Sequence, residues 1–261
     1  AATAAGSLPG VDPSEAVRTV LGEAPLLPWL LELPQRGVHA AMIGRSLAML
    51  VDLPVEIVAS GWRVADSRSR DQTRARDLLA RDLDALEELG AEHAGPLKVQ
   101  AAGPWTLAAS LELRTGHAVL SDVGARRDLA QSLAAGLGDL VADLGKRLPA
   151  AQVVLQIDEP SLPAVLAGRI PTPSGYGSIA AVDAPVAQEA LRALIDGSGA
   201  AACAAHCCAP DAPIALLAGA GFDALSLDAA MLRSGSLDPL GEAIDAGASL
   251  WLGVLDARSA A

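Results

Sequence analysis

The most reactive side chains of the sequence are concentrated in residues 200–211, AAACAAHCCAPD, which hold all three cysteines and one of the four histidines. The small apolar residues before His206 favour a buried strand. Because successive side chains of a strand point to opposite faces, His206 and Cys208 project one way and Cys203 and Cys207 the other. An imidazole beside a thiolate is half of a zinc site. A His-x-Cys pair at a strand end is also common in plain buried packing, so the spacing alone leaves both interpretations open.

Other polar groups recur at the same kind of position, at or just beyond the end of an apolar run. They are Ser7, Asp158, Asp228 and Asp256. In a parallel α/β barrel the carboxyl ends of all strands meet on one face, and that face carries the chemistry. Asp228, on the strand after His206, would add a carboxylate to the imidazole and thiolate, a mixed set that zinc accepts. The pair Asp158-Glu159 is equally compatible with a helix cap or a salt-bridged structural acid.

The elements that would position these groups alternate between strands and helices. Buried strands are expected at residues 153–157, 200–206, 224–228 and 249–254, and helices at 71–89, 126–148, 185–195, 213–218 and 237–246. In the second half of the chain the strands begin about 25 residues apart, which is typical of βα units in a parallel barrel or open sheet. Asp12, Pro13 and Glu15 predict a capped helix that begins near residue 13.

Residues 24–66 interrupt this rhythm, because prolines and glycines break the periodicity. Within this irregular region we expect a helix near residues 41–51 and a hairpin through 55–65. Trp29 and Trp62 are interpreted as packing anchors, since aromatic side chains contribute large buried areas. A short β-rich run before Gly103 and Pro104 is expected to end there and open another helix.

Composition limits the class of protein. The 261 residues allow one domain of the size of an α/β barrel or two smaller domains, and 51% hydrophobic residues supply a large core. A net charge of -12 argues against a nucleic-acid partner and favours a small molecule. No apolar run is long enough to span a bilayer, and the first residues lack the pattern of a signal peptide, so a cytoplasmic protein is expected. Three clustered cysteines cannot form a disulfide framework.

Five short motifs occur in an order that resembles the catalytic barrel of the cobalamin-independent methionine synthases, in particular short relatives with a single barrel. They are GSLP (6–9), GPWTL (103–107), QIDEPSL (156–162), HCC (206–208) and GVLDARS (253–259). The resemblance implies a (β/α)8 TIM-type barrel, of the methionine synthase and uroporphyrinogen decarboxylase kind, over residues 1–261, with the final βα unit absent from this sequence. It also implies a bound zinc ion that activates homocysteine as a thiolate for methyl transfer from methyltetrahydrofolate or another carrier.

The resemblance assigns a role to each polar strand-end residue. His206 and Cys208 match the family's zinc ligands, and Asp228 replaces a glutamate ligand by a shorter carboxylate. Ser7 matches the loop that holds the carboxylate of the substrate amino acid, and Asp158 matches the acid that pairs with its ammonium group. Asp256 matches a strand-end acid near the site of methyl transfer, and it is the predicted catalytic residue.

The sequence also departs from the family pattern. The family's last zinc ligand, a cysteine in a Pro-x-Cys-Gly-Leu motif, has no counterpart, and the glutamate expected to help bind the amino group is not found near residues 36–41. Two alternatives therefore stay open beside the methyltransferase. One is a diverged binding barrel without catalysis. The other is a uroporphyrinogen decarboxylase-like enzyme, which the acidic charge balance disfavours.

Overall fold

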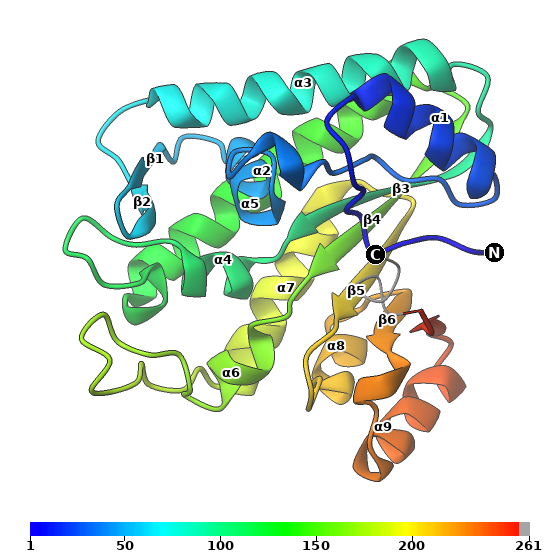
Figure 1. Cartoon of the computed structure of the whole chain (residues 1–261). Coiled ribbons are helices and arrows are strands. Elements are labelled where there is room, and N and C mark those ends of the chain that lie inside the picture. Colours follow the sequence, from blue (N-terminus) through cyan, green and yellow to red (C-terminus); the bar gives the residue numbers. More distant parts are fainter. Residues whose placement is uncertain (256–261) are drawn as a thin grey trace.

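A parallel sheet flanked by helices forms the centre of the molecule (Figure 1), in a computed structural model that describes residues 1–255. Across the sheet the strands are β3 (Gly95–Ala102), β4 (Ala151–Asp158), β5 (Ala202–Cys207), β6 (Ala224–Asp228) and β7 (Ser249–Gly253). The α-helices are α1 (Pro13–Glu23), α2 (Met42–Ala48), α3 (Arg70–Gly90), α4 (Pro104–Ser110), α5 (Val123–Arg147), α6 (Leu162–Leu166), α7 (Ala184–Ser198), α8 (Ile214–Ala220) and α9 (Ser234–Asp245). Strands and helices alternate from β3 onward, which confirms the predicted parallel α/β class.

Two short segments extend the sheet beyond β3. Trp29 forms an isolated parallel bridge with Lys98 of β3, and Ser7 forms another with Glu32. At the opposite edge, β7 pairs only with β6 among residues 1–255. The described residues therefore form an open sheet, and the closed eight-stranded barrel expected from the sequence is not seen in them.

The irregular region contains the elements expected of it. Helix α2 lies within the predicted 41–51, and β1 (Val55–Val58) pairs antiparallel with β2 (Gly61–Val64) as the predicted hairpin. Trp29 and Trp62 are both buried, in agreement with their interpretation as packing anchors.

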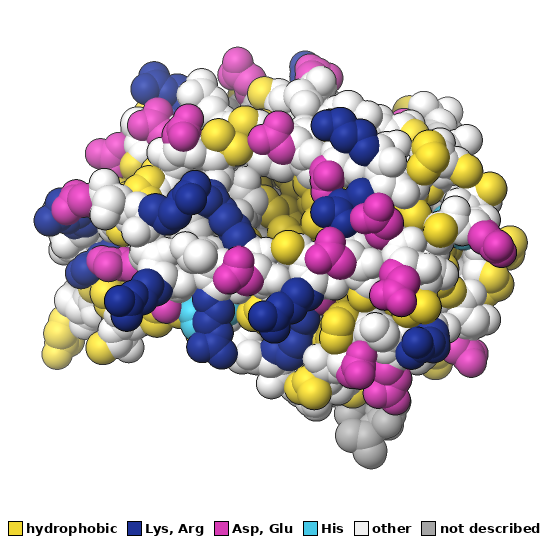
Figure 2. Space-filling model, turned by 90° about the horizontal axis from the view of Figure 1, so that it is seen from above, with side chains coloured by type: hydrophobic (Ala, Val, Ile, Leu, Met, Phe, Trp, Pro, Cys, Tyr) yellow, Lys and Arg dark blue, Asp and Glu magenta, His cyan; other side chains and the backbone are white. Residues whose placement is uncertain are grey.

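Helix α3 shows why the sequence folds as it does locally. The Ser69 hydroxyl accepts a hydrogen bond from the Gln72 amide at 3.0 Å and so caps the first turn. Leu79, Leu83 and Leu86 recur at helical spacing and are buried. Acidic and basic side chains intermingle over the face of the molecule seen from the side of α1 and α3 (Figure 2), as expected for a solvated exterior.

The central sheet has one apolar and one polar face, and this division places the site. Leu97 and Val99 of β3 and Leu155 and Ile157 of β4 are fully buried in the core that the helices cover. The residues between them point to the other face, because side chains alternate along a strand. On that face lie Lys98, Gln100, Gln156, Asp158, His206, Ser226 and Asp228.

Candidate functional site at the carboxyl ends of the strands

Strand register brings three of the polar residues side by side. Asp158 of β4 is the Cα partner of His206 on β5, and His206 is in turn the partner of Ser226 on β6. The parity prediction for residues 200–211 is confirmed on its apolar side, since Cys203 and Cys207 both lie in the core. The polar face therefore presents a carboxylate, an imidazole and a hydroxyl in one row at the strand ends.

The His206 side chain is oriented by a contact with Ser226. Its Nδ1 lies 3.0 Å from the Ser226 hydroxyl, and this bond fixes the ring and leaves Nε2 available for another partner. Burial lowers the pKa of His206 to about 4, and the positive charge of Lys98 acts in the same direction. The imidazole is therefore neutral at physiological pH, which is the form that binds a metal ion.

Asp158 is buried, with 6% of the residue's surface exposed. It accepts a hydrogen bond of 2.6 Å from the Gln156 side-chain amide. Burial raises the pKa of Asp158 to about 7, against the opposing effects of the Lys98 charge and the Gln156 hydrogen bond. Because a positive charge nearby favours the ionised form, an ammonium group placed at Asp158 would shift this carboxyl toward its charged state.

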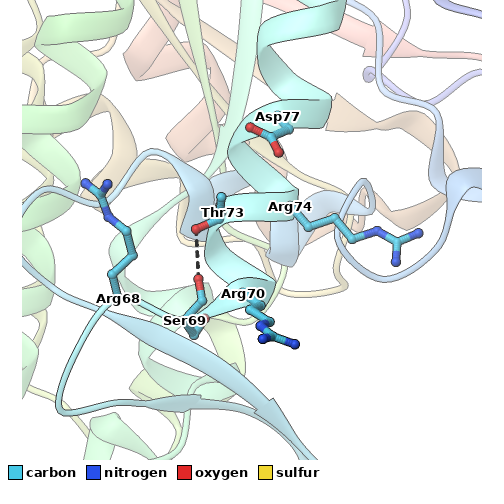
Figure 3. A pocket seen from close by; sticks show the side chains of 6 residues that line it. All are labelled: Arg68, Ser69, Arg70, Thr73, Arg74 and Asp77. Carbon is cyan, nitrogen blue, oxygen red and sulfur yellow. Dashed lines mark hydrogen bonds between the residues drawn. The ribbon is translucent and has the colours of Figure 1, made fainter.

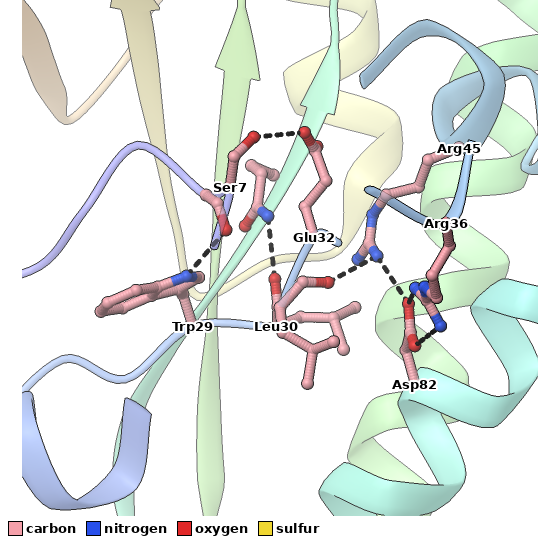
Figure 4. A network of polar contacts seen from close by, with 10 residues as sticks. Ser7, Trp29, Leu30, Glu32, Arg36, Arg45 and Asp82 are labelled. Atoms are coloured by element: carbon pink, nitrogen blue, oxygen red, sulfur yellow. Dashed lines mark hydrogen bonds and ion pairs between the residues drawn. The ribbon is translucent and has the colours of Figure 1, made fainter. Parts of the chain in front are cut away.

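The loop that carries Ser7 lies against the same polar face. The Ser7 hydroxyl donates to the Glu32 carboxylate at 2.6 Å, and the Trp29 indole donates to the Gly6 carbonyl at 2.9 Å (Figure 4). Gly6 adopts a φ of 156°, and a Cβ at this position would overlap the Gln100 side chain. A glycine is therefore required where the loop crosses the strand ends.

Two buried charged residues of this face were missed by the sequence analysis. Glu32 is 5% exposed, and Lys98 is fully buried beneath the Ser7 loop. Burial lowers the pKa of Lys98 to about 8, while the negative charges of Asp158 and Glu32 oppose that shift. The available signal was a charged residue between Leu97 and Val99 in a run that is otherwise buried. Glu32 supplies a carboxylate beside Ser7, a few residues before positions 36–41, where the resemblance leads us to expect a glutamate.

Glu32 is also the innermost member of a chain of charges that leads away from the site (Figure 4). Arg45 lies in its electrostatic field and donates to the Leu31 carbonyl at 2.7 Å. Asp82 of α3 receives both Arg36 nitrogens at 2.7 Å and Arg45 at 3.3 Å. These contacts fix α2 and α3 to the segment that bears Glu32.

Glu159, next to Asp158, has a structural position. It is fully buried and accepts hydrogen bonds from the Trp105 amide, the Thr106 amide and the Thr106 hydroxyl at 2.9, 2.8 and 2.7 Å. These donors belong to the first turn of α4, so the helix-cap interpretation of the Asp158-Glu159 pair is correct for Glu159, although the helix belongs to the preceding βα unit. Burial raises the pKa of Glu159 to about 7.

The two other predicted zinc ligands, Cys208 and Asp228, lie at or beyond the ends of their strands. Cys208 lies one residue beyond β5 and is exposed, and Asp228 ends β6. The Asp228 carboxylate accepts the Ala230 amide at 2.9 Å and caps the short 3-10 helix η3 (Ala229–Met231). No group of three His, Cys, Asp or Glu side chains within residues 1–255 is arranged to hold a metal ion. Asp256 lies outside the described residues, so its predicted role has no structural counterpart here.

A hollow of about 280 Å³ lies elsewhere, at the start of α3. It is lined by Arg68, Ser69, Arg70, Thr73, Arg74 and Asp77. The side chains of Arg68 and Arg74 extend in different directions (Figure 3), so they present no common point at which an anion would be held. The hollow contains none of the predicted site residues, and we assign no ligand to it.

The sheet and its polar strand ends define a class of protein: a parallel α/β fold with its candidate site at the carboxyl edge of the sheet. The chain belongs to the family described as the cobalamin-independent synthase catalytic domain, whose model matches residues 1–261. The family predicted from the five motifs is thereby confirmed, and it supports a role in methyl transfer. No helix within residues 1–255 has the length and apolar character needed to cross a membrane.

A solved structure with a similar fold is that of a B12-independent methionine synthase from Shewanella sp. W3-18-1 in complex with selenomethionine. The two superpose with a TM-score of 0.56 at 16% sequence identity, and the match covers 94% of this chain and 70% of the other. At this identity the likeness shows the fold alone. No curated protein sequence matches the chain.

Proposed function

We propose that the chain is a zinc-dependent methyltransferase that activates a thiol acceptor resembling homocysteine, in the manner of a methionine synthase. Membership of the synthase family over residues 1–261 carries this proposal. The row formed by Asp158, His206 and Ser226 supports it, because this row lies on the sheet edge where such a fold performs its chemistry. The methyl donor is methyltetrahydrofolate or another methyl carrier, and the protein acts in the cytoplasm.

The polar face offers separate partners for the two ends of an amino-acid head group. Asp158 would pair with the ammonium group, and Glu32 adds a second negative charge close by. The Ser7 loop would hold the carboxylate, with the Ser7 hydroxyl turning from Glu32 to the ligand. Asp256 is proposed to act near the methyl group that is transferred.

The proposed zinc ligands are His206, Cys208 and Asp228. An imidazole whose Nδ1 is bonded, a thiol one residue beyond β5 and a carboxylate at the end of β6 are the kinds of donor that zinc accepts, and they would hold the ion together. The ion would supply one kind of chemistry, which is to hold the acceptor thiol as a thiolate at neutral pH. His206 is already neutral in this environment, so it needs no proton loss to act as a ligand.

The proposal also includes closure of the barrel. One side of β7 is without a strand partner among residues 1–255, and the Ser7 segment lies at the other end of the strand order. One further parallel strand between these two edges would close the sheet into the barrel expected for the family.

Metal analysis and a methyl-transfer assay test the proposed function together. The full chain, purified from zinc-replete cells, is expected to contain about one zinc ion per molecule, as a single catalytic site requires. Cys208→Ser should lose both the zinc and the formation of methionine from homocysteine. Cys203→Ser is the matched control, since Cys203 is a cysteine of β5 that lies in the core, and it should keep both. Zinc-free wild-type protein, or a Cys208→Ser variant with full zinc and activity, would overturn the proposal.

A further inference from the structure

One backbone carbonyl links the Ser7 loop to two strands of the sheet. The Ala5 carbonyl accepts a hydrogen bond from the Lys98 ammonium of β3 at 3.2 Å and another from the Gln156 side-chain amide of β4 at 2.8 Å. Ala5 is two residues before Ser7, so both donors act directly on the loop. The hydrogen bonds from Lys98 and Gln156, two side chains of the polar face, therefore fix the position of this loop.

The same Gln156 amide also reaches Asp158. Its nitrogen lies 2.6 Å from Asp158 Oδ1, and a primary amide has two protons to donate. One Gln156 side chain thus bridges the Ala5 carbonyl and the Asp158 carboxylate. The distance between the Ser7 loop and Asp158 is therefore fixed through a single amide group.

Lys98 has no simple structural explanation. It is fully buried, and its two hydrogen bonds go to neutral oxygens, the Ala5 carbonyl and Gln100 Oε1. A buried charge costs free energy unless it is well paired, and an apolar side chain of similar size is often as stable or more so. Among the described residues Lys98 makes no ion pair, although Glu32 and Asp158 are near enough to act on it electrostatically. The buried Lys98 ammonium is therefore better explained by a role in positioning the Ser7 loop than by a contribution to the stability of the fold.

We propose that Lys98 and Gln156 are positioning residues that hold the Ser7 loop and Asp158 at the separation of the carboxylate and ammonium groups of one α-amino acid. The pair would thereby make the site specific for a ligand that carries both groups on one carbon. This inference rests on the proposed function, because it assigns the two groups to the acceptor amino acid.

Three variants test whether Lys98 and Gln156 position the Ser7 loop and Asp158. Lys98→Met removes the ammonium group and keeps the length of the side chain, and Gln156→Leu removes the bridging amide. Gln72→Leu is the matched control, because Gln72 is also a buried glutamine whose amide donates to two carbonyls, those of Leu47 and Leu53, away from the site. Each variant is made in the full chain and compared with the wild type at a temperature well below unfolding.

The first measurement is the affinity for L-homocysteine and for its deaminated analogue, γ-mercaptobutyrate. Wild-type protein should prefer homocysteine, and Lys98→Met and Gln156→Leu should each reduce that preference about tenfold, equivalent to the loss of one well-placed polar interaction. Zinc content should not change. The preference should also be unchanged in Gln72→Leu, because a general loss of stability does not select between two ligands. If both site variants keep the wild-type preference, the proposal is wrong.

The second measurement needs no ligand. The Leu8 amide donates to the Glu32 carbonyl at 2.8 Å, so its hydrogen exchange reports on the attachment of the loop. Exchange at Leu8 should be faster in Lys98→Met and Gln156→Leu and unchanged in Gln72→Leu. Unchanged hydrogen exchange at Leu8 in both site variants would refute the proposal that Lys98 and Gln156 position the loop. If wild-type protein binds no homocysteine while exchange is accelerated, the proposed function fails and the positioning of the loop stands.

Discussion

Replacing Glu159 tests whether the most deeply buried acid of the sequence motifs is structural. Its carboxylate satisfies three donors at the start of α4, and two of them are backbone amides that the helix itself cannot satisfy. Glu159→Met keeps a similar volume and removes every acceptor. Since each of the three buried donors left without a partner costs about 1 to 3 kcal/mol, the free energy of unfolding at about pH 4.5, where the contribution of Glu159 is fully present, should fall by about 3 kcal/mol or more.

The matched variant is Glu159→Gln, which keeps one acceptor oxygen and is expected to lose roughly half as much. For a protein of this size a loss of 1 kcal/mol lowers Tm by about 2 to 4 °C, so Glu159→Met should melt roughly 10 °C below the wild type. Urea unfolding monitored by circular dichroism gives the free energies directly. A Glu159→Met variant within about 1 kcal/mol of Glu159→Gln would refute the argument from unsatisfied donors.

The pH dependence of the same pair tests the electrostatic part of the argument. Burial raises the pKa of Glu159 to about 7, above its ordinary value of 4.5, so the folded state binds more protons than the unfolded state between these values. Its contribution to stability is therefore present below about pH 4.5 and is lost as the pH rises to about 7. Glu159→Gln has no such group, so it should gain on the wild type by up to about 3 kcal/mol across this interval. Parallel pH profiles for the two proteins would show that the pKa is not raised.

Two further predictions concern other buried groups. Asp82→Asn should lower the free energy of unfolding by about 3 to 5 kcal/mol, because it leaves the buried Arg45 and the partly buried Arg36 without their shared counter-charge, and a variant that unfolds like the wild type would contradict this. A thiol reagent at pH 8 should label Cys208 in the native, zinc-free protein and spare Cys207, because Cys208 is exposed while burial raises the pKa of Cys207 to about 12. Mass spectrometry of the labelled peptides checks this. Labelling of Cys207 in the native protein would be inconsistent with the structure.

The sequence predicts well those features that depend on local periodicity. The separation of Cys203 and Cys207 from His206 follows from the alternation of side chains along a strand, and the structure confirms it. Helix α3 begins and ends within a residue of the predicted 71–89, because its leucine spacing and the glycine at its end, Gly90, are local signals. The family was recognisable because its motifs are short, contiguous and in order along the chain.

Features that depend on distant partners could not be predicted in the same way. Glu32 follows an irregular segment, and its place beside Ser7 depends on a bridge between residues 25 positions apart. Glu159 is explained only by α4, whose donors precede it by more than 50 residues. The predicted zinc ligands are an intermediate case. Periodicity places His206 and Asp228 on the polar face, whereas Cys208 lies beyond the end of β5, where the strand alternation no longer applies.

The two faces of the sheet divide stability and recognition between them. On the helix-covered face Leu97, Val99 and their neighbours are fully buried, and each such side chain stabilises the fold by about 1.5 to 3 kcal/mol. On the other face Lys98, Gln156 and Asp158 are equally buried but polar, and burying such groups costs free energy that their hydrogen bonds only partly offset. The apolar and polar side chains alternate along the same strands. Burial of the apolar side chains therefore stabilises the strand backbone from which the polar side chains project. The polar groups are thus kept in a fixed arrangement before any ligand arrives, which reduces the entropy lost when a small, doubly charged head group binds.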